Sequence, residues 1–168
     1  IVPMRFKIIS ISCACLLGCA SIYPGNNPTV VFEDGYHFGI LNKSLIKNHD
    51  TNTWFSKQYD TYRPELNRLE PSNLLHISIK VFMGTWCHDS KREVPRFYKI
   101  LDELNYNYAN FKIIGLTKDK KGYFHDYTSF NITHTPTIIF YRNGTEIGRI
   151  IEKPDGSLES HLLRIISS

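Results

Sequence analysis

The chain has 168 residues, of which 42% are hydrophobic, and it contains ten tyrosines and ten phenylalanines. This composition supports one folded core with an N-terminal extension and argues against intrinsic disorder. The formal net charge is +4, and without Arg5 and Lys7, which lie in a segment expected to be removed, 18 basic residues stand against 16 acidic ones. Because these numbers are nearly equal, the charge gives no reason to expect a nucleic-acid partner.

The N-terminal segment has the pattern of an export signal. A basic start, Met4–Lys7, precedes an apolar stretch, Ile8–Leu17, that is too short to span a bilayer. The run Leu16-Leu17-Gly18-Cys19 resembles the lipobox of bacterial lipoproteins. The resemblance implies removal of residues 1–18 and a lipid on Cys19 that anchors the protein in the cell envelope, facing the periplasm. Ala20, in place of an aspartate, favours the outer membrane. The alternative is an ordinary signal peptide.

Loss of that segment leaves a single free thiol. Cys13 and Cys15 leave with the signal and Cys19 is acylated, so Cys87 is the one free thiol expected in the mature chain. Because no internal disulfide can then form, the fold depends on its apolar core. A free thiol in an oxidising compartment is a liability unless it is used or buried.

Residues 19–30 are rich in proline, glycine and asparagine and are predicted to form a tether. Residues 31–74 are predicted to be an extension packed on the core. The local elements expected around this extension are a hairpin over Val30–Leu41 turning at Glu33-Asp34-Gly35, a helix from Thr51 to Tyr59 capped by Asp50, and a helical segment that starts at Pro64 and ends before Pro71.

From residue 75 the hydrophobic pattern becomes regular, and we expect a core over residues 75–168. The expected elements are strand His76–Met83, helix Asp89–Leu104, strand Phe111–Leu116, helix Tyr123–Phe130, strands Thr137–Tyr141 and Glu146–Ile151, and helix Ser157–Ile166. Arg142-Asn143-Gly144 is a strong hairpin signal between the last two strands. This order predicts an α/β fold, with a mixed central sheet and helices on both faces.

The run Trp86-Cys87-His88-Asp89-Ser90 lies where the first core strand meets the following helix. The free N–H groups and the dipole of a helix N-terminus favour a thiolate at Cys87. The thiolate is the form that attacks disulfides. Ser90 stands where a dithiol motif has its second cysteine, which rules out a self-contained dithiol cycle.

This order of elements resembles the thioredoxin fold over residues 75–167. The motifs that carry the resemblance are Trp86-Cys87, Pro95 in the following helix, Thr135-Pro136-Thr137 before a strand, and Gly144 in the last hairpin. The run from Gly84 to Phe97 is similar to a bacterial thioredoxin-like subgroup with Cys-x-Asp-Ser. Two further departures from thioredoxins are Val81, in place of a buried acid, and His88-Asp89, in place of Gly-Pro.

Six residues are expected to have roles at this site. Cys87 is the expected nucleophile. Ser90 either donates a hydrogen bond to the Cys87 sulfur or is a tolerated small polar residue. The four residues expected to contact substrate are Trp86, His88, Thr135 and Pro136. Pro136 is expected to be cis, with the backbone of Thr135 offered to an extended substrate segment.

No cofactor or metal site is predicted. Cys87 has no partner cysteine, and the adjacent His88 is poorly placed to share an ion with it. No glycine-rich phosphate loop is present in the sequence.

Two functions compete on this evidence. The first is a monothiol oxidoreductase or isomerase that forms mixed disulfides with protein thiols or small thiols. The second is a non-catalytic binding module on a thioredoxin scaffold, which the missing cysteine and missing buried acid favour. A third, weaker alternative is a monothiol glutaredoxin with an iron–sulfur cluster. Trp86 and the predicted export of the protein argue against it.

Overall fold

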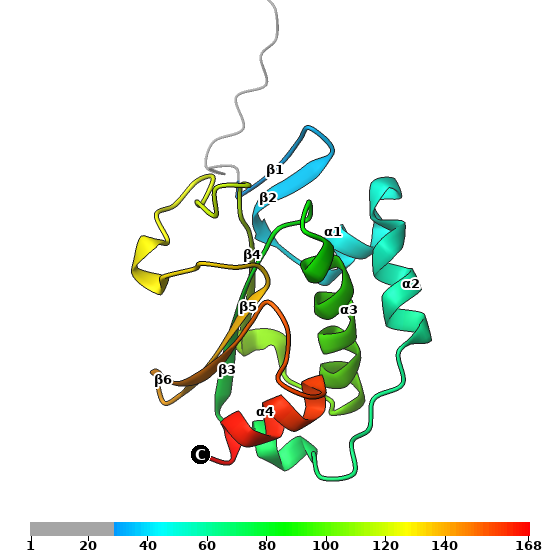
Figure 1. The fold of residues 1–168 in the computed structure, drawn as a ribbon, viewed down its shortest axis with the longest axis vertical. Helices are drawn as coiled ribbons and strands as arrows, with labels where there is room; N and C mark the ends of the chain where they lie inside the picture. The colour runs from blue at the N-terminus through cyan, green and yellow to red at the C-terminus, as the bar shows by residue number, and fades with distance from the viewer. Residues whose placement is uncertain (1–28) are drawn as a thin grey trace, which may run out of the picture.

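The computed structural model describes residues 29–168 of the chain. The predicted signal segment, Cys19 and most of the predicted tether lie outside these residues. In the part that is described, one sheet carries its α-helices on a single side (Figure 1). No helix within residues 29–168 has the length and apolar character needed to cross a membrane.

Six strands form the sheet in the order β1-β2-β4-β3-β5-β6. The strands are β1 (Val30–Glu33), β2 (Tyr36–Leu41), β3 (Ile77–Met83), β4 (Phe111–Gly115), β5 (Thr137–Arg142) and β6 (Thr145–Ile151). β3 and β4 are parallel, and the other neighbouring pairs are antiparallel. Helix α3 (His88–Glu103) connects β3 to β4, and helix α4 (Leu158–Ile166) follows the β5–β6 hairpin. This mixed sheet and order of elements confirm the predicted thioredoxin fold.

Both predicted hairpins are present, and their turns have the same cause. Asp34 and Gly35 have φ angles of 52° and 81°, and Asn143 and Gly144 have 50° and 81°. Two successive positive φ angles match the right-handed twist of the flanking strands, and Asp-Gly and Asn-Gly adopt them at low cost. The first hairpin adds β1 and β2 to the sheet, with Ile40 opposite Ile114 of β4.

The helices of the extension differ from those expected. Helix α1 (Lys43–Asn48) was not predicted, and the side chain of Asn42 caps it. Helix α2 (Thr53–Thr61) begins after a 3-10 turn at Asp50–Asn52, so Asp50 is not its cap. The expected helix from Pro64 is absent, and only a 3-10 turn at Pro71–Leu74 follows.

The segment around Pro64, which forms no helix, contacts α4 through Glu159. The carboxylate of Glu159 accepts hydrogen bonds from the Tyr62 hydroxyl at 2.8 Å and from the Glu65 N–H at 3.3 Å. The Glu159 side chain thus holds residues 62 and 65 of this segment against α4.

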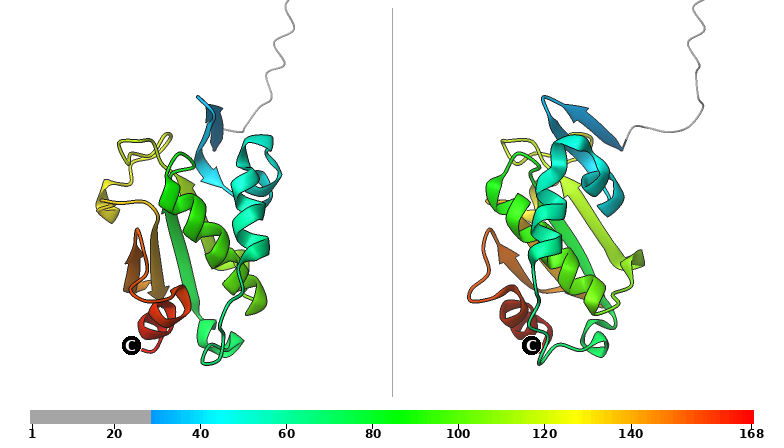
Figure 2. Two further views of the ribbon diagram at one scale, coloured as in Figure 1. Left: turned by 45° about the vertical axis from the view of Figure 1, so that its right-hand side comes forward. Right: turned by 90° about the vertical axis from the view of Figure 1, so that its right-hand side faces the viewer.

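The α-helices that the structure describes pack on one face of the sheet, which corrects the prediction of helices on both faces. On that face, Val81 of β3 packs in one core with Phe97 of α3, Leu162 of α4, Phe55 of α2 and Ile46 of α1. Figure 2 shows α2 beside α3 on this side. The opposite face has a smaller cluster of Phe82, Ile114, Leu116 and Ile139.

A loop covers part of that opposite face in place of the predicted helix Tyr123–Phe130. Only a 3-10 turn, Thr128–Phe130, forms there. The rings of Tyr127 and Phe130 lie 5.4 and 4.9 Å from the ring of Phe82. The chain doubles back at Gly122, where a Cβ would lie 2.0 Å from the carbonyl oxygen of His125. Individual aromatic side chains therefore cover the apolar cluster without a helix.

Candidate thiol site

Cys87 is the N-cap residue of α3. Its backbone is extended, and its carbonyl oxygen accepts a hydrogen bond from the Lys91 N–H at 3.0 Å, within the first turn of the helix. Its own N–H donates to the carbonyl of Gly84 at 2.9 Å, which closes a tight turn after β3. The side chain is partly exposed and is the free cysteine among the described residues. The sulfur therefore lies at a helix N-terminus, where the helix dipole favours negative charge.

The loop before β5 lies directly against Cys87. β3 and β5 pair with Phe82 opposite Thr137, so the end of one strand lies beside the start of the other. The Thr135–Pro136 peptide bond is cis. The Cys87 thiol donates a hydrogen bond to the carbonyl oxygen of Thr135, with 3.0 Å between the sulfur and the oxygen. The structure thus brings Cys87, Thr135 and Pro136 together.

Ser90 is fully buried and faces the turn before Cys87. Its Oγ accepts a hydrogen bond from the N–H of Gly84 at 3.2 Å. Among residues 29–168 no hydrogen bond joins Ser90 to Cys87, so the expected donation to the sulfur is not seen here. In this structure Ser90 holds the backbone of the turn that carries the cysteine.

Trp86 and His88 flank the sulfur in different environments. The Trp86 indole N–H donates to the carbonyl of Leu116 at 2.9 Å, and the ring lies so close to Gly84 that a Cβ there would be 2.4 Å from the indole. The indole is therefore fixed against the loop after β4. The His88 side chain is 86% exposed and is accessible to a partner from solution.

Two cations near Asp89 were not anticipated from the sequence. The Asp89 carboxylate lies 2.8 Å from Arg92 and 3.9 Å from Lys153, which follows β6. The N–H of Glu152 donates to the carbonyl of Pro136 at 2.7 Å, which ties the same loop to the cis-proline. These cations offset a negative charge two residues from Cys87. The i, i+3 spacing of Asp89 and Arg92 was a usable signal, whereas nothing local pointed to Lys153.

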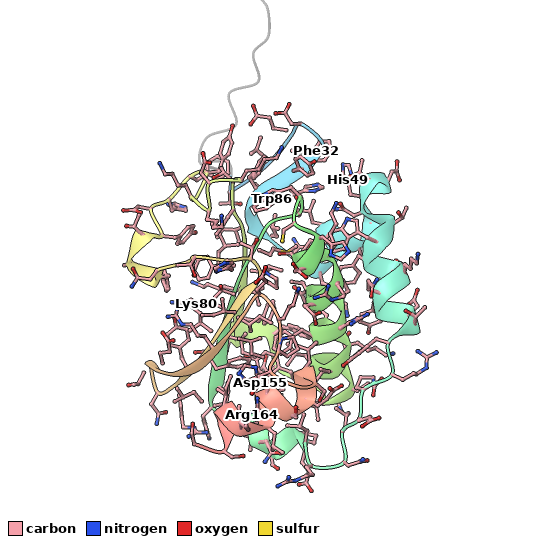
Figure 3. All side chains as sticks on the ribbon, in the orientation of Figure 1. Phe32, His49, Lys80, Trp86, Asp155 and Arg164 are labelled. Atoms are coloured by element: carbon pink, nitrogen blue, oxygen red, sulfur yellow. The ribbon has the colours of Figure 1, made fainter. Side chains whose placement is uncertain are left out.

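A second unexpected neighbour is His37 of β2. The backbone N–H of His37 donates to the Thr85 hydroxyl at 2.9 Å, and that hydroxyl donates to the backbone carbonyl of His37 at 3.3 Å. Burial, and then the nearby His49, lower the pKa of His37. Figure 3 shows Phe32, His49 and Trp86 gathered at this end of the molecule. The extension therefore supports the turn before Cys87.

Within residues 29–168, no group of three or more histidine, cysteine, aspartate or glutamate side chains is placed to hold a metal ion. The predicted lipid-attachment residue, Cys19, lies outside the described residues.

No family model and no curated protein matches this chain. Among solved structures, it is similar to mitochondrial thioredoxin 3 of Saccharomyces cerevisiae, with 20% identity, 55% of this chain and 77% of that one covered, and a TM-score of 0.37. Fasciola hepatica thioredoxin is 18% identical, with 61% of this chain and 88% of that one covered and a TM-score of 0.39. Thioredoxin O2 of Arabidopsis thaliana is 17% identical, with 70% of this chain and 84% of that one covered and a TM-score of 0.38. Similarity this low adds nothing to the fold assignment, which rests on the strand order and helix connections.

Proposed function

We propose that the protein is a monothiol thiol–disulfide oxidoreductase or isomerase that acts through Cys87. The observation that carries the proposal is the position of the sulfur, partly exposed at the N-terminus of α3 and 3.0 Å from the Thr135 carbonyl beside the cis-proline. A helix N-terminus supports the thiolate, and the thiolate is the attacking species.

The reaction proceeds by exchange. The Cys87 thiol first loses its proton to water or to a buffer base, and its hydrogen bond to the Thr135 carbonyl breaks in this step. The thiolate then attacks one sulfur of a substrate disulfide; a new S–S bond forms, the old one breaks, and the second substrate sulfur leaves as a thiolate. A second thiolate, from the substrate or a small thiol, attacks the mixed disulfide and releases Cys87 unchanged. The serine at position 90 has no thiol to do this, so release depends on an external thiol.

We further propose that this chemistry serves exported proteins at the cell envelope, with the protein anchored by a lipid on Cys19. The support is the sequence Leu16-Leu17-Gly18-Cys19 and its flanks. Metabolic labelling of the expressed full chain with a radioactive fatty acid tests the anchor. Label on the wild type and none on Cys19→Ser is expected; label on both, or on neither, contradicts it.

The exchange is tested by incubating the protein with a peptide that carries a glutathione mixed disulfide. Mass spectrometry is expected to find a peptide or glutathione adduct on Cys87 that an added thiol removes, and no adduct on Cys87→Ser. Ser90→Ala, which keeps the thiol, is the matched control and is expected to form the adduct. Absence of an adduct on the wild type, together with partners that Cys87→Ser still captures, would select the non-catalytic binding module.

A further inference from the structure

The sheet face opposite the α-helices holds a cavity that the thiol site does not use. Its volume is about 290 Å³, and it lies between β2, β3 and β4 and the loop that covers this face. Phe82 and Ile114 form an apolar floor, and Tyr127 and Phe130 of the loop form a wall. The volume lies just below the range for small-molecule sites, roughly 300–1,000 Å³, so only a small ligand fits.

Two lysines line the same cavity. Lys80 and Lys112 are direct partners in the parallel ladder between β3 and β4, and both residues line the cavity, Lys80 half-buried and Lys112 exposed. Neighbouring strands lie about 4.8 Å apart, and like charges side by side on one face destabilise a sheet. Within the described part of the chain, neither lysine forms an ion pair with a carboxylate.

Aromatic rings position one of these charges without neutralising it. The Lys80 Nζ lies 4.7 Å from the ring centroid of Phe130 and 4.8 Å from that of Tyr141. Figure 3 shows Lys80 on the side of the sheet away from α3. Cation–π contacts attract the ammonium group but leave its full charge and its N–H donors available to an anion. Arg149, which lies on this face opposite Ile139, is already paired with Glu146.

We propose that this cavity binds a small amphipathic anion, an aromatic or aliphatic monocarboxylate. Its carboxylate accepts hydrogen bonds from the ammonium groups of Lys80 and Lys112 and removes their mutual repulsion. Its apolar body lies in the cavity against Ile40, Tyr127 and Phe130. The site is independent of Cys87 and of the thiol exchange proposed above.

The probe for this site is phenylacetate, with neutral phenylacetamide as the matched ligand. Each is titrated into the isotope-labelled full chain, and backbone amide shifts are followed by NMR. Phenylacetate is expected to shift the amides of Lys80, Lys112 and Phe130 at millimolar concentration. Phenylacetamide is expected to bind at least about tenfold more weakly, because it lacks the charge that the lysines pair with. Equal binding of the two ligands, or no shift at these amides, overturns the proposal.

Charge-removing variants provide the second arm. Lys80→Met and Lys112→Met keep the apolar stems and are each expected to weaken phenylacetate binding by about tenfold. Lys57→Met, on the exposed side of α2, is the control and is expected to bind as the wild type does. Phenylacetate is also expected to raise the Tm of the wild type and of Lys57→Met but not of the double variant at Lys80 and Lys112. A rise of the same size in all three proteins overturns the site.

Discussion

The hydroxyl of Thr85 is bonded twice to the backbone of His37, accepting from its N–H at 2.9 Å and donating to its carbonyl at 3.3 Å. Both residues are buried, at 2% exposure each. Thr85 lies two residues before Cys87, and His37 lies in the second strand of the N-terminal hairpin. A single side chain thus joins the extension to the turn that presents the thiol.

Thr85→Val should lower the free energy of unfolding by about 1–3 kcal/mol, because it leaves the buried His37 N–H without a partner. Thr85→Ser keeps the hydroxyl and is the matched control. Urea denaturation followed by circular dichroism measures both. Equal stability of Thr85→Val and the wild type would show that the two bonds do not matter.

Stability should fall on acidification partly through His37. Its pKa in the folded protein lies below the ordinary value of about 6.5, because it is buried and close to His49. At a pH well above about 6.5 both states are neutral and the group contributes nothing to the pH dependence. As the pH falls below that value the unfolded state takes up the proton first, so the free energy of unfolding decreases.

His37→Gln should therefore flatten the dependence of unfolding free energy on pH between about 7 and 5. The slope, rather than the absolute stability, is the relevant measurement, since the substitution also changes packing. His161, whose pKa is lowered by burial and by Arg164, keeps part of the slope in the variant. His88→Gln, at an 86% exposed side chain, is the control. An unchanged slope in His37→Gln contradicts the assignment.

Ser90→Cys should turn the proposed monothiol site into a dithiol site. The new thiol replaces a buried hydroxyl that faces Gly84, one helical turn from Cys87. We expect an intramolecular disulfide with Cys87 and release of a bound peptide at least about tenfold faster than in the wild type, because an intramolecular thiol replaces an external one. Single-turnover release followed by mass spectrometry measures the rate, with Ser90→Ala as control. Release at the wild-type rate would mean that the two positions cannot meet.

Asp102→Asn should destabilise the protein by about 2–4 kcal/mol. The Asp102 carboxylate accepts hydrogen bonds from the Tyr59 hydroxyl at 2.5 Å, from the Tyr108 hydroxyl at 2.8 Å and from the ammonium group of Lys43. These bonds link α1 and α2 to the last turn of α3. Urea denaturation measures the loss, and Asp60→Asn, at an exposed position of α2, is the control.

The hydrogen bonds to Asp102 also make the stability of the protein depend on pH in the acid range. Burial opposes the charged carboxylate, but the hydrogen bonds from Lys43, Tyr59 and Tyr108 prevail and keep the pKa of Asp102 below its ordinary value. Its contribution is present above the unfolded pKa of about 4 and is lost as the pH falls through the lower folded value. Asp102→Asn should therefore lose less stability than the wild type on acidification below about pH 4. A loss equal to that of the wild type would contradict this.

Local signals predicted most of the core and failed where distant residues intervened. The 3.6-residue spacing of apolar side chains predicted α3 to within a residue at each end. The same kind of reasoning placed a helix at Tyr123–Phe130, where the aromatic side chains instead pack singly on Phe82. It also missed α1, a short helix whose formation depends on the cap at Asn42 and on burial of Ile46.

In the candidate site too, the features set by neighbours in the chain could be predicted, and those set by distant residues could not. Cys87 at the start of a helix and proline at the start of a strand could be predicted, because both depend on neighbours in the chain. The bond of Ser90 to Gly84, the approach of Lys153 to Asp89 and the support of Thr85 by His37 could not. Each depends on which strands and loops the folded sheet brings together.

By itself, the sequence determined a mixed α/β core, two tight hairpins and a cysteine, Cys87, where a strand is followed by a helix. Those features follow from side-chain period and turn chemistry, which act over a few residues. Only the tertiary structure decided that the α-helices share one face, that a loop covers part of the other, and that Lys80 lies beside Lys112. Strand order and register decide such neighbours, and they depend on burying apolar surface contributed by the whole chain.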